Sequence, residues 1–229
     1  AAISPRTRAI IVNSPHNPTG SLFSTVDREK LAKLISGTNI VVLSDEVYEH
    51  ILFDGEQHAS LCAHPELAAR SIVVSSFGKT YHITGWKIGY VVGPAALMAE
   101  FRKVHQFNVF TVHTPSQLAL AEYMQDAERH LRLAAFYEEK RDFFRQLLAA
   151  TPFELLPCRG TYFQLARYDR ISDLPDRAFA EWMTRDVGVA VIPVSVFYAN
   201  GRDDRVVRFC FAKQESTLRA AAERLCKAL

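Results

Sequence analysis

Two lysines, Lys79 and Lys87, lie close together in the segment SSFGKTYHITGWKIGYVVG, which is otherwise poor in charge. A lysine beside small residues at the end of an apolar strand is partly shielded from water, and this favours the neutral amine that attacks carbonyl groups. Lys79 is therefore a candidate for forming a Schiff base. Lys87 and Ser76 offer a cation and a hydroxyl group to a phosphate. The alternative is that both lysines are ordinary solvated side chains.

Three further polar residues follow apolar runs. Asp45 ends the run IVVLSDE, where an unpaired carboxylate is costly, so we expect a cationic partner such as a protonated ring nitrogen. Its alternative role is to cap the segment EVYEHILF that follows. Tyr48 and Asn17, the latter in HNPTG, can donate hydrogen bonds to a ring hydroxyl. Turn formation by Asn17 and simple packing of Tyr48 are the alternatives.

The elements that must position these residues have the pattern of an α/β fold. Continuous apolar runs at 9–15, 40–46 and 71–77 predict strands of a parallel sheet. A helix is predicted between the first two, with Ser24 as its N-cap and Gly37 just past its end. Because parallel sheets bind ligands beyond the carboxyl ends of their strands, the polar residues at these ends are expected to meet at one edge.

The second half of the chain has a different pattern. Helical periodicity over 95–108 and 115–151 is followed, beyond Pro152, by short strands alternating with helices. We therefore predict an α/β domain followed by a smaller α+β C-terminal domain. The expected boundaries are 1–130 for the first, larger domain and 131–229 for the small one.

Composition excludes several classes of partner. The 27 basic and 25 acidic residues give a net charge of +2 without a basic block, so neither nucleic acid nor an anionic membrane is expected as a partner. The four cysteines are widely spaced, which predicts reduced, buried thiols and no metal site. No apolar run approaches a membrane span, and the opening AAISPRTRAIIVNSP has no signal-peptide pattern. We therefore expect a cytoplasmic protein.

Four segments carry a family resemblance: NSPHNPTG, SDEVYEHILFDG, SSFGKTYHITGWKIGYVVG and RFCFAK. In order and spacing they resemble the fold-type I, pyridoxal-phosphate-dependent aminotransferases of class I/II. The resemblance implies the cofactor pyridoxal 5'-phosphate (PLP), amino-acid and 2-oxo-acid substrates, and a homodimer. It also implies that the first domain is a PLP-dependent transferase-like three-layer α/β domain, incomplete at its N-terminus. It also implies a role for each matching residue: Lys79 carries the cofactor as an aldimine, Asp45 pairs with the pyridine nitrogen, Asn17 and Tyr48 bind the ring hydroxyl, Ser76 and Lys87 hold the phosphate, and Arg208 binds the substrate carboxylate.

Lys87 departs from the arginine that most of this class carries. The form TGWK resembles the kynurenine, glutamine and methionine aminotransferase branch, which implies methionine, glutamine or an aromatic amino acid as the amino donor. Some members of that branch also eliminate leaving groups from cysteine conjugates, so a β-lyase on the same scaffold is an alternative. Tyr162 and Phe163 are candidates to line the substrate pocket, with core packing as the alternative.

The resemblance also implies a segment preceding AIIVNSP that is absent here. Family members carry there an N-terminal arm, a turn whose amides complete the phosphate site, and an aromatic side chain that stacks on the pyridine ring. We therefore expect residues 1–229 alone to aggregate or to bind PLP weakly, with exposed apolar sheet edges. A non-catalytic PLP-binding effector domain of a transcriptional regulator stays open as an alternative to the enzyme.

Overall fold

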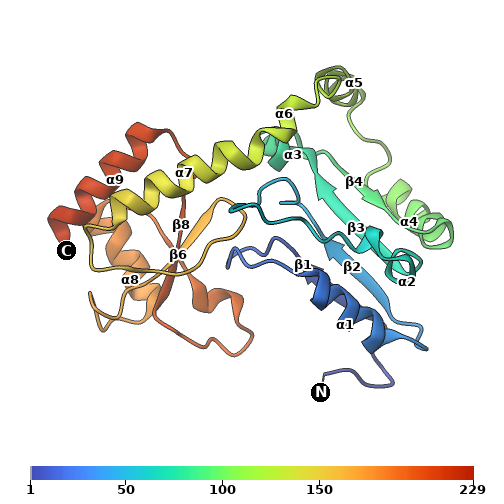
Figure 1. Cartoon of the computed structure of the whole chain (residues 1–229), viewed down its shortest axis with the longest axis horizontal. Helices are drawn as coiled ribbons and strands as arrows, with labels where there is room; N and C mark the ends of the chain where they lie inside the picture. Colours follow the sequence, from blue (N-terminus) through green and yellow to red (C-terminus); the bar gives the residue numbers. More distant parts are fainter. Residues whose placement is uncertain (1) are drawn as a thin grey trace. The chain divides into compact units, whose positions relative to one another are not determined.

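A computed structural model describes residues 2–229. The chain divides into two compact units (Figure 1). The first contains residues up to 15, 22–52 and 56–133, and the second contains 16–21, 53–55 and 134–229. Two short excursions, around Asn17 and Asp54, thus join the second unit although they lie early in the sequence. Each unit is described by itself below.

The first unit contains a four-stranded sheet with the order β1-β2-β3-β4. Its strands are β1 (Ala9–Asn13), β2 (Val41–Asp45), β3 (Ser71–Ser76) and β4 (Gly89–Val92). The first three strands are parallel, and β4 pairs antiparallel with β3. All three strands predicted from continuous apolar runs are therefore confirmed, and their carboxyl ends lie at one edge of the sheet.

One face of this sheet is packed. Helix α1 (Thr25–Ile35) buries Leu31, Ala32 and Ile35 against Val42 and Val73 of the sheet. The short η1 (Leu61–Ala63) and α2 (Pro65–Ala68) add Leu61 and Leu67 to the same core. Ser24 caps α1 in a capping box with Asp27, as its position before the helix predicted.

The remaining elements of the first unit follow β3. They are α3 (Phe77–Thr80), η2 (Thr84–Trp86), α4 (Ala95–Asn108), α5 (Thr114–Tyr123) and α6 (Glu128–Leu131). Helix α4 coincides with the helix predicted over 95–108, but it buries none of its side chains. The helical pattern predicted over 115–151 is divided among α5, α6 and α7 (Leu133–Leu148), because turns interrupt it after Tyr123 and Leu131.

The second unit is built on the antiparallel sheet β5-β6-β8-β7. Its strands are β5 (Glu154–Leu155), β6 (Phe163–Arg167), β7 (Ile192–Pro193) and β8 (Val206–Cys210). Helices α7, α8 (Asp176–Trp182) and α9 (Glu215–Ala228), the π-helical turn η3 (Met183–Val187) and η4 (Val194–Phe197) complete it. The packing is dominated by aromatic rings, such as Tyr168 stacked on Phe179 with centroids 3.8 Å apart.

The prediction that all four cysteines are buried is wrong. Cys158 is buried and Cys210 is half-buried, but Cys62 and Cys226 are exposed. Both exposed cysteines lie on the outer side of short or terminal helices, where sequence spacing carries no information about burial. All four thiols are free. Among residues 2–229, no helix is both long and apolar enough to cross a membrane.

Candidate active site

At the carboxyl end of β2, neighbouring side chains point to opposite faces of the sheet. Successive residues of a strand alternate between faces, and Ser44 and Glu46 are buried on the packed face beside Val42. Asp45 is half-buried and points to the other face, in register with Asn13 of β1 and Val74 of β3. The dipeptide Asp45-Glu46 thus divides its two carboxylates between two different environments.

Both the main-chain carbonyl and the side-chain carboxylate of Asp45 accept hydrogen bonds. Its carbonyl oxygen accepts hydrogen bonds from Ser14 N at 3.0 Å and from Asn13 Nδ2 at 3.0 Å. Its carboxylate Oδ1 accepts from Val47 N at 3.1 Å. This contact resembles capping, the alternative weighed for Asp45, but turns rather than a helix follow it.

Lys79 lies in the last turn of α3, directly after β3. Its Nζ is 5.8 Å from the centroid of the Tyr48 ring, and Tyr48 is only 2% exposed. Ser76 is the N-cap of α3, because its Oγ accepts from Gly78 N at 3.1 Å. The structure therefore brings Lys79 and Tyr48 together, and it places Ser76 and Asp45 at the ends of adjacent strands.

Two glycines permit this tight arrangement. A Cβ at Gly78 would lie 2.9 Å from Cα of Thr84, and one at Gly89 would clash with the carbonyl oxygen of Ser75. Both clashes involve main-chain atoms, which cannot move away as a flexible side chain can. The glycines thus let the segment after Lys79 fold back closely on β3.

Lys87 lies between η2 and β4 in the left-handed region, with φ of 56°, and its side chain is exposed. A lysine in this conformation is uncommon and marks a constrained turn. Its predicted role at a phosphate stays a prediction.

In the second unit, Arg208 of β8 is bonded to Asn17. Its Nη1 donates to Asn17 Oδ1 at 2.7 Å. The guanidinium carbon lies 4.0 Å from the centroid of the Phe163 ring and 5.7 Å from that of Phe197. A guanidinium bonded at one nitrogen and packed against an aromatic ring is restricted in its orientation, which favours two parallel hydrogen bonds to a carboxylate.

Tyr162 and Phe163, the candidates for lining the substrate pocket, lie in different surroundings. Phe163 is 7% exposed and packs against the Arg208 guanidinium, whereas Tyr162 is half-buried with its ring 5.4 Å from that of Tyr137. Core packing, the alternative given for this pair, therefore describes Phe163, and its contact with Arg208 adds a positioning role.

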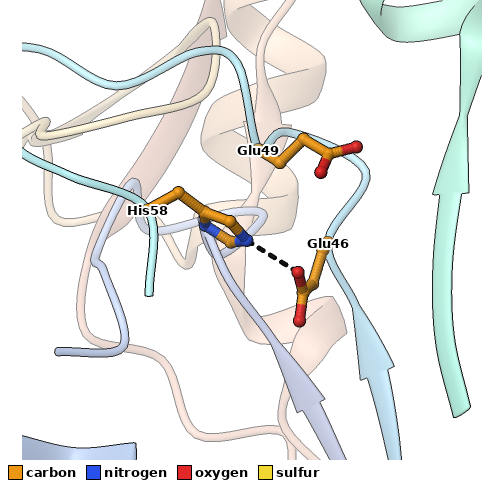
Figure 2. A group of neighbouring side chains, drawn as sticks. All are labelled: Glu46, Glu49 and His58. Atoms are coloured by element: carbon orange, nitrogen blue, oxygen red, sulfur yellow. Dashed lines mark hydrogen bonds and ion pairs between the residues drawn. The ribbon is translucent and has the colours of Figure 1, made fainter. Parts of the chain in front are cut away.

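A cluster around the buried Glu46, which the sequence analysis missed, follows Asp45 in the chain. Figure 2 shows Glu46, Glu49 and His58, with His58 Nε2 2.8 Å from Glu46 Oε2. Glu46 Oε1 also accepts from Ser44 Oγ at 2.9 Å and Leu61 N at 3.0 Å. Burial alone raises the pKa of Glu46, but hydrogen bonds from His58 and Leu61 N outweigh it and hold the pKa below its ordinary value.

Glu49 belongs to the same cluster but has its own partners. It accepts hydrogen bonds from Ser75 Oγ at 2.6 Å and from the hydroxyl of Tyr90. Burial and this bond to Glu49 raise the pKa of Tyr90 to about 12. The ligand-type atoms of Glu46, Glu49 and His58 all lie within 4.8 Å of one another, as in metal sites. Protein donors already satisfy both carboxylates, so we interpret the cluster as a structural clasp at the end of β2.

The alternation of side chains along the strand VVLSDE could have predicted this cluster. If Asp45 faces a ligand, Ser44 and Glu46 must face the core. A buried glutamate then requires donors, and His58 is one of the two histidines in the loop that follows.

These features define a protein of the α/β aminotransferase fold, and the chain belongs to the family Aminotransferase class I and II, whose profile matches residues 1–225. It is 52% identical over 226 residues to methionine aminotransferase of Escherichia coli, a match that covers 98% of this chain and 58% of that protein. It is 35% identical over 244 residues to kynurenine–oxoglutarate transaminase 1 of Homo sapiens, covering 97% of this chain and 58% of that protein.

Solved structures agree with the sequence matches. An Escherichia coli structure reported with a methionine aminotransferase function is 51% identical and gives a TM-score of 0.96, covering 99% of this chain and 60% of that one. The N-succinyldiaminopimelate aminotransferase of Mycobacterium tuberculosis is 36% identical with a TM-score of 0.92, covering 100% of this chain and 60% of that one. The predicted family and fold class are confirmed. The chain spans about three-fifths of the length of these relatives.

Proposed function

We propose that the protein to which this chain belongs is a PLP-dependent aminotransferase. The observation that carries the proposal is the position of Lys79, which follows β3 beside the buried Tyr48 ring while Asp45 ends the neighbouring strand. An amine, a phenol and a carboxylate at the ends of adjacent strands are the donor set that PLP requires. The residues present therefore fit this cofactor.

Each candidate residue has a proposed role. The Lys79 amine binds the cofactor covalently and moves a proton during the reaction. Asp45 keeps the pyridine nitrogen protonated, since its carboxylate at the end of β2 offers an opposite charge. Tyr48 and Asn17 bind the ring hydroxyl, and Ser76 and Lys87 bind the phosphate. When bound, PLP supplies an electron sink that stabilises negative charge at the substrate Cα.

Arg208 is proposed to bind the carboxylate of the amino-acid and 2-oxo-acid substrates. Its hydrogen bond to Asn17 and its contact with Phe163 fix the guanidinium plane. We propose methionine, glutamine or an aromatic amino acid as the donor, supported by the similarity to methionine and kynurenine aminotransferases. A homodimer in the cytoplasm is part of the same proposal.

The test is to trap the bond to the cofactor in a full-length protein that contains this chain. The amine and the cofactor aldehyde condense with loss of water, and borohydride then reduces the resulting double bond to a stable link. Peptide mapping should find the pyridoxyl group on Lys79. The matched controls are Lys79→Arg, which should take up no label, and Lys103→Arg on exposed α4, which should label normally. A label on Lys87 contradicts the assignment, and labelling without amino-group transfer favours the effector domain.

A further inference from the structure

Tyr48 and Lys79 both lie beyond the ends of the strands that lead to them. Strand β2 pairs with β3 as far as Asp45 and Val74, and Tyr48 lies in the turns that follow. Lys79 lies in α3, after the end of β3. Turns outside a sheet have more conformational freedom than paired strands, so the sheet itself does not fix Tyr48. Its ring is nevertheless buried and lies 5.8 Å from Lys79 Nζ, which indicates a further link between the two segments.

The side chain of Glu49, the residue after Tyr48, makes such a link. Its Oε1 accepts a hydrogen bond from Ser75 Oγ of β3 at 2.6 Å and another from the hydroxyl of Tyr90 of β4. Ser75 and Tyr90 lie opposite each other in the register of the two strands. Figure 2 shows the Glu49 carboxylate pointing away from His58, the partner of the other glutamate in the clasp. Glu49 thus connects the turn that carries Tyr48 to β3 and β4.

This link leads to Lys79 by a short path. Ser75 adjoins Ser76, which caps α3, and Lys79 lies in that short helix. Between the Tyr48 turn and the segment of Lys79, the path contains one hydrogen-bonded step, from Ser75 to Glu49. Hydrogen bonds to an ionised carboxylate are stronger than those between neutral groups, so this path can hold the two side chains at a defined spacing.

The two donors of the link are suited to persist. Ser75 is 3% exposed, so water competes poorly for its hydroxyl. Burial and the bond to Glu49 raise the pKa of Tyr90 to about 12, and its hydroxyl therefore remains a donor throughout the neutral pH range. Breaking the link would leave buried polar groups without partners, which is costly.

We propose that Glu49 is a positioning residue that holds Tyr48 at its spacing from Lys79. The inference rests on the proposed function, in which Lys79 binds the cofactor and Tyr48 binds its ring hydroxyl. Glu49 acts through Tyr48, because a broken link gives the turn more freedom and the Tyr48 hydroxyl then spends less time at the ring oxygen. A glutamate that only stabilises the fold would leave the contact of Tyr48 with the cofactor unchanged.

The test follows the protonation of the nitrogen that joins Lys79 to the cofactor, in a full-length protein that contains this chain and is loaded with PLP. The absorbance band of the cofactor changes when this nitrogen loses its proton, so a spectral pH titration gives the pKa of the nitrogen. Loss of the proton leaves the negative charge on the ring oxygen unbalanced, and a hydrogen bond from Tyr48 stabilises that charge. Tyr48 therefore lowers this pKa, and a loosened Tyr48 should raise it.

Tyr90→Phe removes one donor to Glu49 and keeps both the ring and the Glu49 charge. It should raise the pKa of the joining nitrogen by at least about 0.5, and so should Ser75→Ala, a smaller change that removes the other donor. The matched control is Tyr168→Phe, because Tyr168 is buried in the second unit and its hydroxyl donates to Leu174 O at 2.8 Å. The control should lose stability but move the titration by less than about 0.2.

Titration at the wild-type pH in both Tyr90→Phe and Ser75→Ala overturns the proposal. An equal rise in Tyr168→Phe also overturns it, because a general loosening of the fold would then be the cause. A wild-type protein without a bond between the cofactor and Lys79 contradicts the proposed function, and the inference falls with it. A normal wild-type spectrum with unshifted variants contradicts only the positioning role of Glu49.

Discussion

Arg208 Nη1 donates a hydrogen bond of 2.7 Å to Asn17 Oδ1, although the two residues are 191 positions apart in the sequence. The turn that contains Asn17 belongs to the second unit, together with the strand that carries Arg208. The amide oxygen accepts at the edge of the guanidinium, from Nη1, and the Phe163 ring lies 4.0 Å from the guanidinium carbon. These contacts restrict the orientation of the Arg208 side chain, which would reduce the entropy lost in binding a substrate carboxylate, the role proposed for it.

The first prediction concerns this arginine. In a full-length protein containing the chain, Arg208→Lys should keep the charge but lose the fork, and kcat/KM for an amino-acid donor should fall roughly 10- to 100-fold. Steady-state kinetics with methionine or phenylalanine measures the effect. Arg202→Lys is the matched control, because that arginine is exposed and paired with Asp204. Equal kinetics for the two variants would contradict the role.

The second prediction concerns the charge of Asp45. One opposite charge near the ring nitrogen is worth about 4 kcal/mol, so Asp45→Ala should slow amino-group transfer about a thousandfold. A cofactor analogue with a permanently charged ring should restore part of the rate, because it no longer needs the carboxylate. Single-turnover kinetics with both cofactors checks this. An unchanged rate in the variant rules out the assignment.

The third prediction uses two glycines of one short segment. Gly89→Ala should lower the free energy of unfolding by about 1–3 kcal/mol, because the added methyl group clashes with the Ser75 carbonyl oxygen. Gly85→Ala should have little effect, since a Cβ there meets nothing within 4 Å. Urea denaturation of both variants provides the comparison. A loss at Gly85→Ala equal to that at Gly89→Ala would be incompatible with the described packing.

The fourth prediction is a pH dependence from the Glu46 clasp. The pKa of Glu46 is lowered in the folded state, so its stabilising contribution is present above the ordinary glutamate value of about 4.3 and is lost as the pH falls through the folded pKa. The wild-type free energy of unfolding should therefore drop steeply below about pH 4.3, and Glu46→Gln should flatten this dependence.

Denaturation at several pH values measures the slope. Glu66→Gln on α2, where the side chain is exposed, is the control and should keep the wild-type slope. If the stability of Glu46→Gln depends on pH as steeply as that of the wild type, the role of Glu46 in the clasp is contradicted. The variant should also be less stable at neutral pH, because His58 and Leu61 N lose a charged acceptor.

Several elements of this protein were predicted from its sequence because they depend on neighbouring residues. Three apolar runs predicted β1, β2 and β3, and Ser24 predicted the start of α1, because strand burial and helix capping depend on neighbouring residues. The same runs placed Asp45 and Lys79 at strand ends. Motif order then predicted the family, which the comparisons confirmed.

Tertiary structure decided what neighbours in the sequence do not specify. The exposure of Cys62 and Cys226 depends on which helix face meets a core, and the division of the 115–151 pattern depends on where turns form. The bond between Arg208 and Asn17 needs a turn and a strand from opposite ends of the chain. Strand alternation could have placed Glu46 on the face opposite Asp45, but only packing supplies the His58 and Leu61 donors that make a buried carboxylate stable.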